Sequence, residues 1–374
     1  MKASELRRGT AVLVSIVFVQ ISNAQYTATI LNKTGFANPK PSGASGSATV
    51  GTGDVTVGQV QIPHAMLWTS PGATPIDLNP EGFIQTFATA STGTNQYGYG
   101  YGDVTSSRFH ALKWSGTAGS YEDLNPTGYQ TTQIFGAHGN SQVGIGFGLI
   151  TNNTWRAMLW QGTANSFVDL SPGTVSSAKA VGVWGSQQVG NTQVNGMHAH
   201  AALWSGSAES WVDLHPASFT RTEATGVWNG VQVGFGESTA TGNQSHALLW
   251  RGSAASVVDL NPTGFSFSQA LAISQAGQVG FAYGAATSFR SRAGYWNGTA
   301  GSFVNLHSQL TGLGVNFIES QATGIVDNGD IVGWGFDSAS NYHALRWSQP
   351  VPEPATVAAL GLGLVGLVRR RRRN

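Results

Sequence analysis

Cysteine is absent from this sequence, and charged residues are scarce. Asp, Glu, Lys and Arg together make up 10% of the 374 residues. The absence of cysteine excludes thiol catalysis and zinc–thiolate sites, and it leaves the fold to be held by its core without disulfides. Glu and Lys, which are strong helix formers, are among the residues in short supply. The composition therefore argues against a helical protein.

Aromatic residues and glycine are, by contrast, plentiful. The chain has 50 Gly, 12 Trp, 9 Tyr and 17 Phe. A disordered chain would be rich in charge and poor in aromatic residues, which is the reverse of this composition. Thr, Val and Ser are also abundant and favour strands, while so many glycines indicate many tight turns. We expect an all-β protein.

Residues 1–24 have the three-part layout of a secretory signal peptide. Lys2, Arg7 and Arg8 form a positive region, residues 11–21 form an apolar core, and cleavage is expected after Ala24. A first core strand would explain the apolar run less well, because positive charge precedes it and polar residues follow it. We therefore expect these residues to direct export.

Residues 351–374 have a second three-part layout, in which a short polar motif, an apolar run at 355–368 and an arginine cluster follow one another. The motif and the cluster consist of Val351, Pro352, Glu353, Pro354, Arg369, Arg370, Arg371, Arg372 and Arg373. As a helix, the 14 apolar residues would extend about 21 Å, whereas a stable membrane span needs ~20 residues. The arginines would hold their end on the cytoplasmic side. A short transmembrane helix of this kind suits transient anchoring in the inner membrane.

This C-terminal segment resembles the PEP-CTERM sorting signal of Gram-negative bacteria, in which Pro352-Glu353-Pro354 would be the motif. The resemblance implies that an exosortase-type membrane protease cuts near the motif and passes the protein to the cell surface or extracellular matrix. It covers only residues 351–374. An ordinary tail anchor is the alternative, although so short a span would hold poorly.

The net charge of the region between the two ends is negative. Eight of the 19 Lys and Arg and two of the 18 Asp and Glu lie in the terminal segments, so this region carries a net charge of about −5. It has no run of basic residues, and nucleic acid is therefore not expected as a partner.

A strand-like segment that ends in tryptophan occurs seven times, for example as HALKW at 110–114 and HALLW at 246–250. The seven tryptophans are Trp68, Trp114, Trp160, Trp204, Trp250, Trp296 and Trp347. They are separated by 46, 46, 44, 46, 46 and 51 residues. Since bulky aromatic side chains fill the space between wedge-shaped blades, we interpret these tryptophans as structural.

Each repeat holds three further segments of strand character. One ends in Gly-Val or Gly-Ile, as at 224–227; one is bounded by glycine, as in QVGFG at 232–236; and one is acidic, as in VDLNP at 258–262. Four short strands in about 46 residues is the scale of one propeller blade. Residues 25–349 are therefore predicted to form a seven-bladed β-propeller of four-stranded blades, with six or eight blades as alternatives.

The seventh repeat lacks its fourth strand, because the sorting segment follows Trp347. Residues 29–36 match residues 258–265 at six of eight positions, if Thr29 and Val258 count as a β-branched match. We expect this N-terminal strand to complete the last blade and so to remove the open edges of the ring. The first blade is the weakest, since residues 37–47 are rich in Pro, Gly and Ser and show little strand character.

The repeats also resemble the HAF family of extracellular repeats, which is named for a His-Ala-Phe strand. This chain has His-Ala-Leu or His-Ala-Met at that place, so the pattern is similar and the letters differ. The resemblance extends over about residues 40–347. It supports the expected fold and an extracellular location, and it implies no activity.

Two polar positions recur in the repeats. His64, His110, His200, His246 and His343 share one, with Arg156 and Arg292 in the other two repeats; Asp77, Asp123, Asp169, Asp213 and Asp259 share the second, with Asn305 in the sixth repeat. A metal-binding ring of histidines is one interpretation. We favour a structural role, in which each imidazole bonds a neighbouring carboxylate or backbone group, because equivalent residues of radiating blades lie too far apart for one metal. No metal or cofactor is predicted.

Five tryptophans lie outside the repeated position: Trp155, Trp184, Trp211, Trp228 and Trp334. Exposed aromatic side chains often mark binding surfaces, so these are candidates for stacking on a sugar. We select Trp184 and Trp228 as the pair to test.

No catalytic residue is assigned, because the sequence has no G-x-S-x-G elbow, H-E-x-x-H pair or Walker loop. Asp327-Asn-Gly-Asp330 is interpreted as a hairpin turn and not as a calcium loop. The largest break in the repeat is at 308–319.

We expect a structural or binding component of the cell surface or matrix, with polysaccharide or protein as ligand. A polysaccharide lyase or glycosidase with its site in the propeller funnel is the alternative, which non-repeated carboxylates or histidines there would favour.

Overall fold

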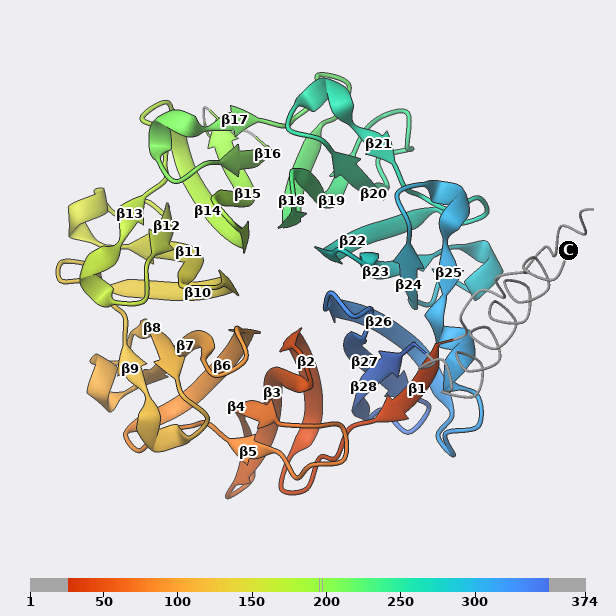
Figure 1. Cartoon of the computed structure of the whole chain (residues 1–374), viewed down its shortest axis with the longest axis horizontal. Coiled ribbons are helices and arrows are strands. Elements are labelled where there is room, and N and C mark those ends of the chain that lie inside the picture. The colour runs from red at the N-terminus through yellow and green to blue at the C-terminus, as the bar shows by residue number, and fades with distance from the viewer. Residues whose placement is uncertain (1–25, 195, 197, 350–374) are drawn as a thin grey trace, which may run out of the picture. The chain divides into compact units, whose positions relative to one another are not determined.

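A computed structural model describes residues 26–194, 196 and 198–349. Within these ranges the chain forms seven four-stranded antiparallel sheets, arranged as blades around a common centre (Figure 1). The predicted all-β, seven-bladed propeller is therefore confirmed.

The first four blades follow one another along the chain. The first contains β2 (Ala37–Ser45), β3 (Ala48–Val57), β4 (Val60–Trp68) and β5 (Ile76–Asp77). The second contains β6 (Phe83–Ser91), β7 (Gln96–Gly102), β8 (Phe109–Trp114) and β9 (Glu122–Asp123). The third contains β10 (Thr131–His138), β11 (Ser141–Phe147), β12 (Arg156–Trp160) and β13 (Val168–Asp169). The fourth contains β14 (Val175–Trp184), β15 (Gln187–Val194), β16 (Ala199–Trp204) and β17 (Val212–Asp213).

The last three blades complete the ring. The fifth contains β18 (Arg221–Trp228), β19 (Val231–Glu237), β20 (Ser245–Trp250) and β21 (Val258–Asp259). The sixth contains β22 (Phe267–Ser274), β23 (Gly277–Tyr283), β24 (Arg292–Trp296) and β25 (Val304–Asn305). The seventh contains β26 (Phe317–Ile325), β27 (Ile331–Asp337), β28 (Tyr342–Ser348) and β1 (Thr27–Ile30). In each blade the first strand in this order is innermost and the last is outermost (Figure 1).

Short 3-10 helices fill several connections between strands. Between third and fourth strands lie η2 (Ala118–Ser120), η4 (Ala164–Ser166), η5 (Ala208–Ser210), η6 (Ala254–Ser256) and η8 (Ala300–Ser302). Between second and third strands lie η1 (Asp103–Thr105), η3 (Leu149–Thr151) and η7 (Ala285–Thr287), and η9 (Leu306–Leu310) follows β25. Small residues suit these tight turns: the Ser120 hydroxyl donates to the Thr117 carbonyl and accepts from the Ser115 N–H.

The N-terminal strand closes the ring, as predicted. In β1, Thr27 pairs with Ser348 and Ile30 pairs with Leu345 of β28. The ladder continues one residue further, since the Leu31 N–H donates to the Ala344 carbonyl at 2.9 Å. Leu31 is buried between the seventh and first blades, so apolar packing and backbone hydrogen bonds both hold the ends of the ring together.

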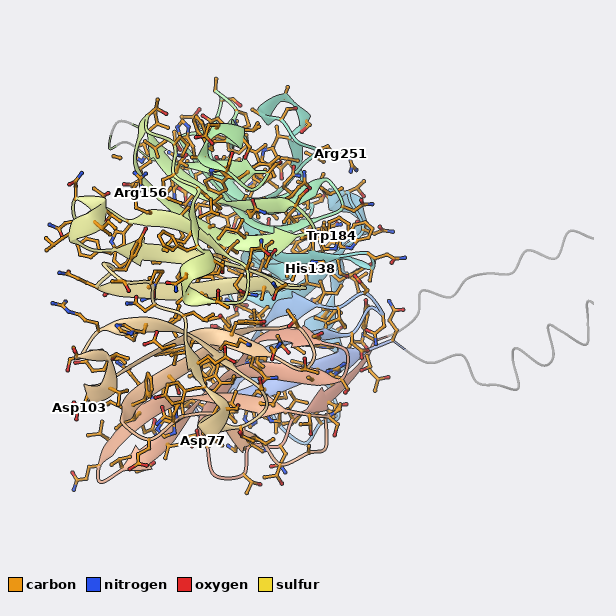
Figure 2. The ribbon with its side chains drawn as sticks, turned by 60° about the vertical axis from the view of Figure 1, so that its left-hand side comes forward. Asp77, Asp103, His138, Arg156, Trp184 and Arg251 are labelled. Atoms are coloured by element: carbon orange, nitrogen blue, oxygen red, sulfur yellow. The ribbon has the colours of Figure 1, made fainter. Side chains whose placement is uncertain are left out.

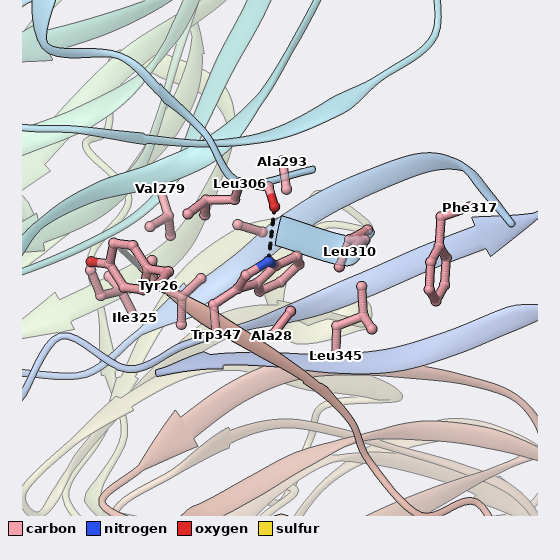
Figure 3. Packing of buried hydrophobic residues seen from close by; sticks show 12 residues of the cluster. Tyr26, Ala28, Val279, Ala293, Leu306, Leu310, Phe317, Ile325, Leu345 and Trp347 are labelled. Carbon is pink, nitrogen blue, oxygen red and sulfur yellow. Dashed lines mark hydrogen bonds between the residues drawn. The ribbon is translucent and has the colours of Figure 1, made fainter. Parts of the chain in front are cut away.

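The core is divided into clusters that lie between neighbouring blades. All seven repeated tryptophans are 0% exposed. Figure 3 shows the cluster between the sixth and seventh blades, where Val279 and Leu306 pack against Leu345 and Trp347. The Trp347 indole N–H donates to the Leu306 carbonyl at 3.1 Å, so this side chain joins two blades by packing and by a hydrogen bond.

The first blade differs from expectation. Residues 37–45 form the strand β2, so the predicted lack of strand character there is wrong. β2 is an edge strand with a neighbour on one side only, and its register against β3 shifts twice, between Ala37 and Lys40 and between Pro41 and Gly43. An edge strand tolerates proline because one side of its backbone needs no hydrogen-bond partner.

The described residues contain no helix long and apolar enough to cross a membrane. The expected signal peptide at 1–24 and the expected transmembrane helix at 351–374 both lie outside the part of the chain that the structure describes.

Candidate functional site

The repeated histidines and aspartates pair within their blades. Nδ1 lies 2.7–2.9 Å from an aspartate Oδ2 in the pairs His64–Asp77, His110–Asp123, His200–Asp213 and His246–Asp259. The other carboxylate oxygen accepts the backbone N–H two residues later, as Asp77 does from Asn79. The predicted bonding of these imidazoles to neighbouring carboxylates is confirmed, and each pair fixes the turn that leads to the next blade.

In two other blades an arginine stands at the histidine position and makes different bonds. Arg156 replaces histidine in the third blade, and its Nε donates to Asp169 at 2.8 Å. In the sixth blade Arg292 instead donates to the backbone carbonyls of Ser291 and Ile318. Among the described residues, no group of three or more His, Asp or Glu side chains is placed to hold a metal ion.

In five blades the turn after the outermost strand also ties the blade to the next one. The side-chain Oδ1 of Asn79 accepts from the Thr86 hydroxyl at 2.8 Å, and this hydroxyl accepts from the Ala65 N–H at 3.0 Å. In two blades a histidine takes the place of Asn79: His215 and His307 each lie 2.8 Å from a hydroxyl of the next blade. Burial lowers the pKa of His307 to about 4, and the positive charge of Arg292 contributes. These features join neighbouring blades.

The hairpins that join the first and second strands of all seven blades meet around one cavity of about 670 Å³, here called the funnel. The residues that line it include Ser45, Ser91, His138, Trp184, Trp228, Ser274 and Asp327, one from each blade. His138 and Trp184 lie on one side of the propeller, whereas Asp103 and Arg156 lie on the other (Figure 2). The funnel therefore opens on the side away from Asp103 and Arg156.

Three aromatic side chains follow one another along the funnel wall, from the third to the fifth blade. The ring centroids of His138 and Trp184 are 5.7 Å apart, and those of Trp184 and Trp228 are 5.8 Å apart. Successive rings are inclined by 39° and 55°, so they form a curved arc and not a flat platform. Trp184 and Trp228 are half-buried, which leaves part of each ring accessible from the cavity.

Hydrogen bonds between neighbouring hairpins hold the funnel wall in place. The Gly185 N–H donates to His138 Nδ1 at 3.3 Å, so the Nδ1 atom is the acceptor and the proton of the neutral ring is on Nε2. The Gly230 N–H donates to Gln187 at 3.1 Å, and the Gln275 N–H donates to Asp327 Oδ1 at 3.2 Å. Backbone and side chains thus preorganise the wall from one blade to the next.

The remaining non-repeated tryptophans lie elsewhere. Trp155 is 40% exposed and contacts Phe147 with ring centroids 5.0 Å apart, outside the funnel. Trp334 contacts Tyr342 at 5.2 Å, and Trp211 packs against the core between the third and fourth blades. Of the five candidates for ligand stacking, only Trp184 and Trp228 line the funnel.

Two non-repeated glutamates lie on innermost strands but do not line the funnel. Glu223 forms an ion pair with Arg221 and accepts from Asn191 at 3.2 Å. Glu319 lies 3.6 Å from Arg290. Each carboxylate is thus engaged with a cation, which is typical of a structural ion pair.

The break in the repeat at 308–319 borders a second cavity of about 560 Å³, lined by His307, Leu310, Asn316 and Phe317 among others. The inserted residues separate His307 from Ser320 by 13 positions, where the equivalent His215 and Thr222 are seven apart. The hydrogen bond across the two blades is kept, so the insertion extends the surface without disturbing the ring.

Sequence reasoning missed His138 and treated Asp327 only as part of a turn. Asp327 lies in the turn two residues after the end of β26, and His138 ends β10, the position that Trp184 and Trp228 occupy in their own blades. A signal was present, since this position is Ser45 and Ser91 in the first two blades and then becomes aromatic in three successive ones. The expected cleavage site at Ala24 and the sorting residues at 351–354 and 369–373 lie outside the described residues.

Residues 350–373 match the PEP-CTERM protein-sorting motif. The chain carries a bacterial sorting signal. This signal implies delivery to the cell surface or the extracellular space, and processing by an exosortase-type system. No curated protein matches the chain.

Two solved structures are similar to the propeller. A puromycin hydrolase has a TM-score of 0.57 and 10% identity over 82% of this chain and 51% of its own. A Mycobacterium tuberculosis puromycin-hydrolyzing peptidase has a TM-score of 0.56 and 10% identity over 86% and 54%. This chain spans about half the length of these proteins, and at such identity the likeness concerns the fold alone.

Proposed function

We propose that this chain is an exported, surface-sorted β-propeller that binds extracellular polysaccharide in its funnel. In this proposal residues 1–24 are the signal peptide, residues 25–349 are the propeller and residues 351–374 are the sorting anchor. The anchor holds the protein briefly in the inner membrane of a Gram-negative bacterium until an exosortase-type protease processes it. The similarity of the repeats to HAF-type extracellular repeats supports this location.

The arc of His138, Trp184 and Trp228 is the observation that carries the proposal. It breaks the seven-fold repetition at a cavity that hairpins of all seven blades line. Aromatic faces bind the apolar faces of sugar rings, while serine, asparagine and carboxylate groups bind sugar hydroxyls. The funnel combines both kinds of group in a cavity of a size that suits a few sugar residues.

The funnel supports binding better than catalysis. Among the described residues Asp327 is the only carboxylate that lines it, whereas glycoside hydrolysis uses a pair. Glu223 and Glu319, the carboxylates on innermost strands, are held by arginines. A lyase or glycosidase is therefore the second candidate, and the same experiment tests it.

The test is a glycan-array screen of the propeller 25–349, which contains all seven blades and the closing strand, with a parallel assay for released reducing ends. We expect saturable binding without release. Trp184→Ala and Trp228→Ala should each weaken binding at least about tenfold, as expected for a buried aromatic anchor. Trp155→Ala, which removes an exposed tryptophan outside the funnel, is the matched control and should leave binding unchanged.

The other outcomes separate the alternatives. Binding that is insensitive to both funnel substitutions would place the glycan site elsewhere on the propeller. Release of reducing ends would show a polysaccharide-cleaving enzyme. Absence of binding to every glycan, without release of reducing ends, would favour a structural or protein-binding role.

A further inference from the structure

The funnel has an uneven distribution of charge. Asp327, from the hairpin between β26 and β27, is the only Asp, Glu, Lys or Arg that lines it in the part of the chain that the structure describes. Asp327 is exposed, and one of its oxygens accepts from the Gln275 N–H. In the part of the chain that the structure describes, its second oxygen has no partner, so this oxygen is available to a ligand.

The cations near the funnel are neutralised or lie outside it. Arg346 donates to the carbonyl of Gly46, a lining residue, but its side chain is buried and pairs with Asp330 at 2.7 Å. Arg251 lies on the same side of the propeller in Figure 2, in the loop after β20, and does not line the cavity. A bound ligand would therefore meet one carboxylate and no free cation.

The aromatic arc carries hydrogen-bond donors that the protein does not use. Within the described ranges, neither the Trp184 nor the Trp228 indole N–H has a partner in the protein. His138 Nε2 carries the proton of the neutral ring, because Nδ1 accepts from Gly185. Blade seven lies roughly across the ring from blade four (Figure 1), so donors on one wall and the Asp327 carboxylate on the other can hold a polyhydroxylated chain between them.

The inclination of the rings restricts the kind of polysaccharide. Rings inclined by 39° and 55° cannot all lie flat against the plane of a crystalline fibre. A single flexible chain can bend around the arc and present successive sugar faces to it.

We propose that the funnel takes one soluble glycan chain of neutral or amino sugars, and that Asp327 rejects acidic sugars. The proposal rests on the proposed function of the same site. A uronic acid carboxylate would meet Asp327 without a compensating cation, while the ammonium group of an amino sugar would pair with it.

The experiment measures dissociation constants of the propeller 25–349 for three hexasaccharides: a neutral galactan, a galacturonan and a fully deacetylated glucosamine chain. The neutral and amino chains should bind in a manner that depends on Trp184, and the galacturonan should bind at least about fivefold more weakly. Asp327→Asn keeps the shape of the side chain and its bond from Gln275. It should weaken binding of the amino chain about two- to fivefold, strengthen binding of the galacturonan by a similar factor and leave the galactan unchanged.

Asp103→Asn is the matched control, because it changes the net charge equally on the opposite side of the propeller (Figure 2). It should change none of the three dissociation constants. Trp184-dependent binding without a charge preference, or equal effects of the two substitutions, overturns this inference and leaves the proposed function standing. Absence of Trp184-dependent binding to every chain overturns both.

Discussion

Nε2 of His343 lies 2.7 Å from Oδ2 of Asp337, in the strand next to its own. In four other blades the equivalent histidine uses Nδ1 to contact an aspartate of the outermost strand. The seventh blade has no such aspartate, because β1 supplies Ile30 at that place. The His343 imidazole therefore bonds toward β27 and not toward the outermost strand, and it still has a carboxylate partner.

Asp337→Asn should destabilise the propeller in a pH-dependent way. Burial alone would raise the pKa of Asp337, but hydrogen bonds from His343, Asn341 and Ala339 outweigh it and lower the pKa from 3.8 to about 2. The contribution of this carboxylate is present above pH 4 and is lost as the pH falls through about 2. Denaturant unfolding should show a cost of roughly 1–2 kcal/mol at pH 7 that shrinks toward zero near pH 2. A cost that is constant over this range would contradict the assigned role.

Ile30→Asp should partly rescue Asp337→Asn. The substitution restores the carboxylate that the other outermost strands carry, at the position that Asp259 occupies opposite Leu248. Alone it should destabilise the protein, since Ile30 packs against the core. In a double-mutant cycle, unfolding should give a favourable coupling energy of at least ~0.5 kcal/mol. Strictly additive costs would show that His343 does not turn toward the new partner.

Trp296→Phe should cost more stability than Trp250→Phe. Both indoles are 0% exposed at equivalent positions. The Trp296 N–H donates to the Leu260 carbonyl at 2.9 Å, whereas the buried Trp250 N–H has no partner within the described residues. The difference in the free energy of unfolding should be about 1 kcal/mol, the net value of one hydrogen bond. Equal costs would mean that packing alone accounts for the repeated tryptophan.

His307→Asn should remove part of the acid sensitivity of folding. The pKa of buried His307 is lowered from 6.5 to about 4, so the unfolded chain binds a proton there more readily than the folded one. The contribution of neutral His307 to the free energy of unfolding is therefore complete above pH 6.5. It falls by roughly 2–3 kcal/mol as the pH drops toward 4. Asparagine, which stands at the equivalent positions 79, 125 and 261, can still accept from Ser320. Unfolding curves between pH 7 and pH 4 should diverge for the two proteins; parallel curves would contradict the prediction.

Gly144→Ala should destabilise the third blade severely. A Cβ at Gly144 would collide with the carbonyl of Gln133 on the neighbouring strand, which is backbone and cannot move aside. We expect a loss of at least ~2 kcal/mol in the free energy of unfolding. Gly119→Ala is the control, because no heavy atom lies within 4 Å of a Cβ placed there. Similar stability of both variants would show that the strand pair relaxes around the extra methyl group.

Several features of the fold follow from local pattern alone. The even spacing of Trp68 to Trp347 predicts seven equivalent units, because each unit must bury the same bulky side chain against the next one. The match between residues 29–36 and 258–265 predicts closure by the N-terminal strand, and β1 pairs with β28 in the corresponding register. Strand character in residues 37–45 was not predictable in this way, because an edge position and not propensity permits proline in β2.

The sequence thus predicted seven blades, with six or eight as alternatives, as well as the buried tryptophans and the sorting signal. All of these depend on residues close together in the chain or repeated at a fixed period. The tertiary structure alone decided that His138, Trp184, Trp228 and Asp327 share one cavity, and that His343 turns to Asp337. The physical reason is ring closure. Hairpins about 46 residues apart meet only when every blade is in place. The contacts of a non-repeated residue in these hairpins therefore depend on the curvature of the whole ring, which the residues near it in the sequence do not specify.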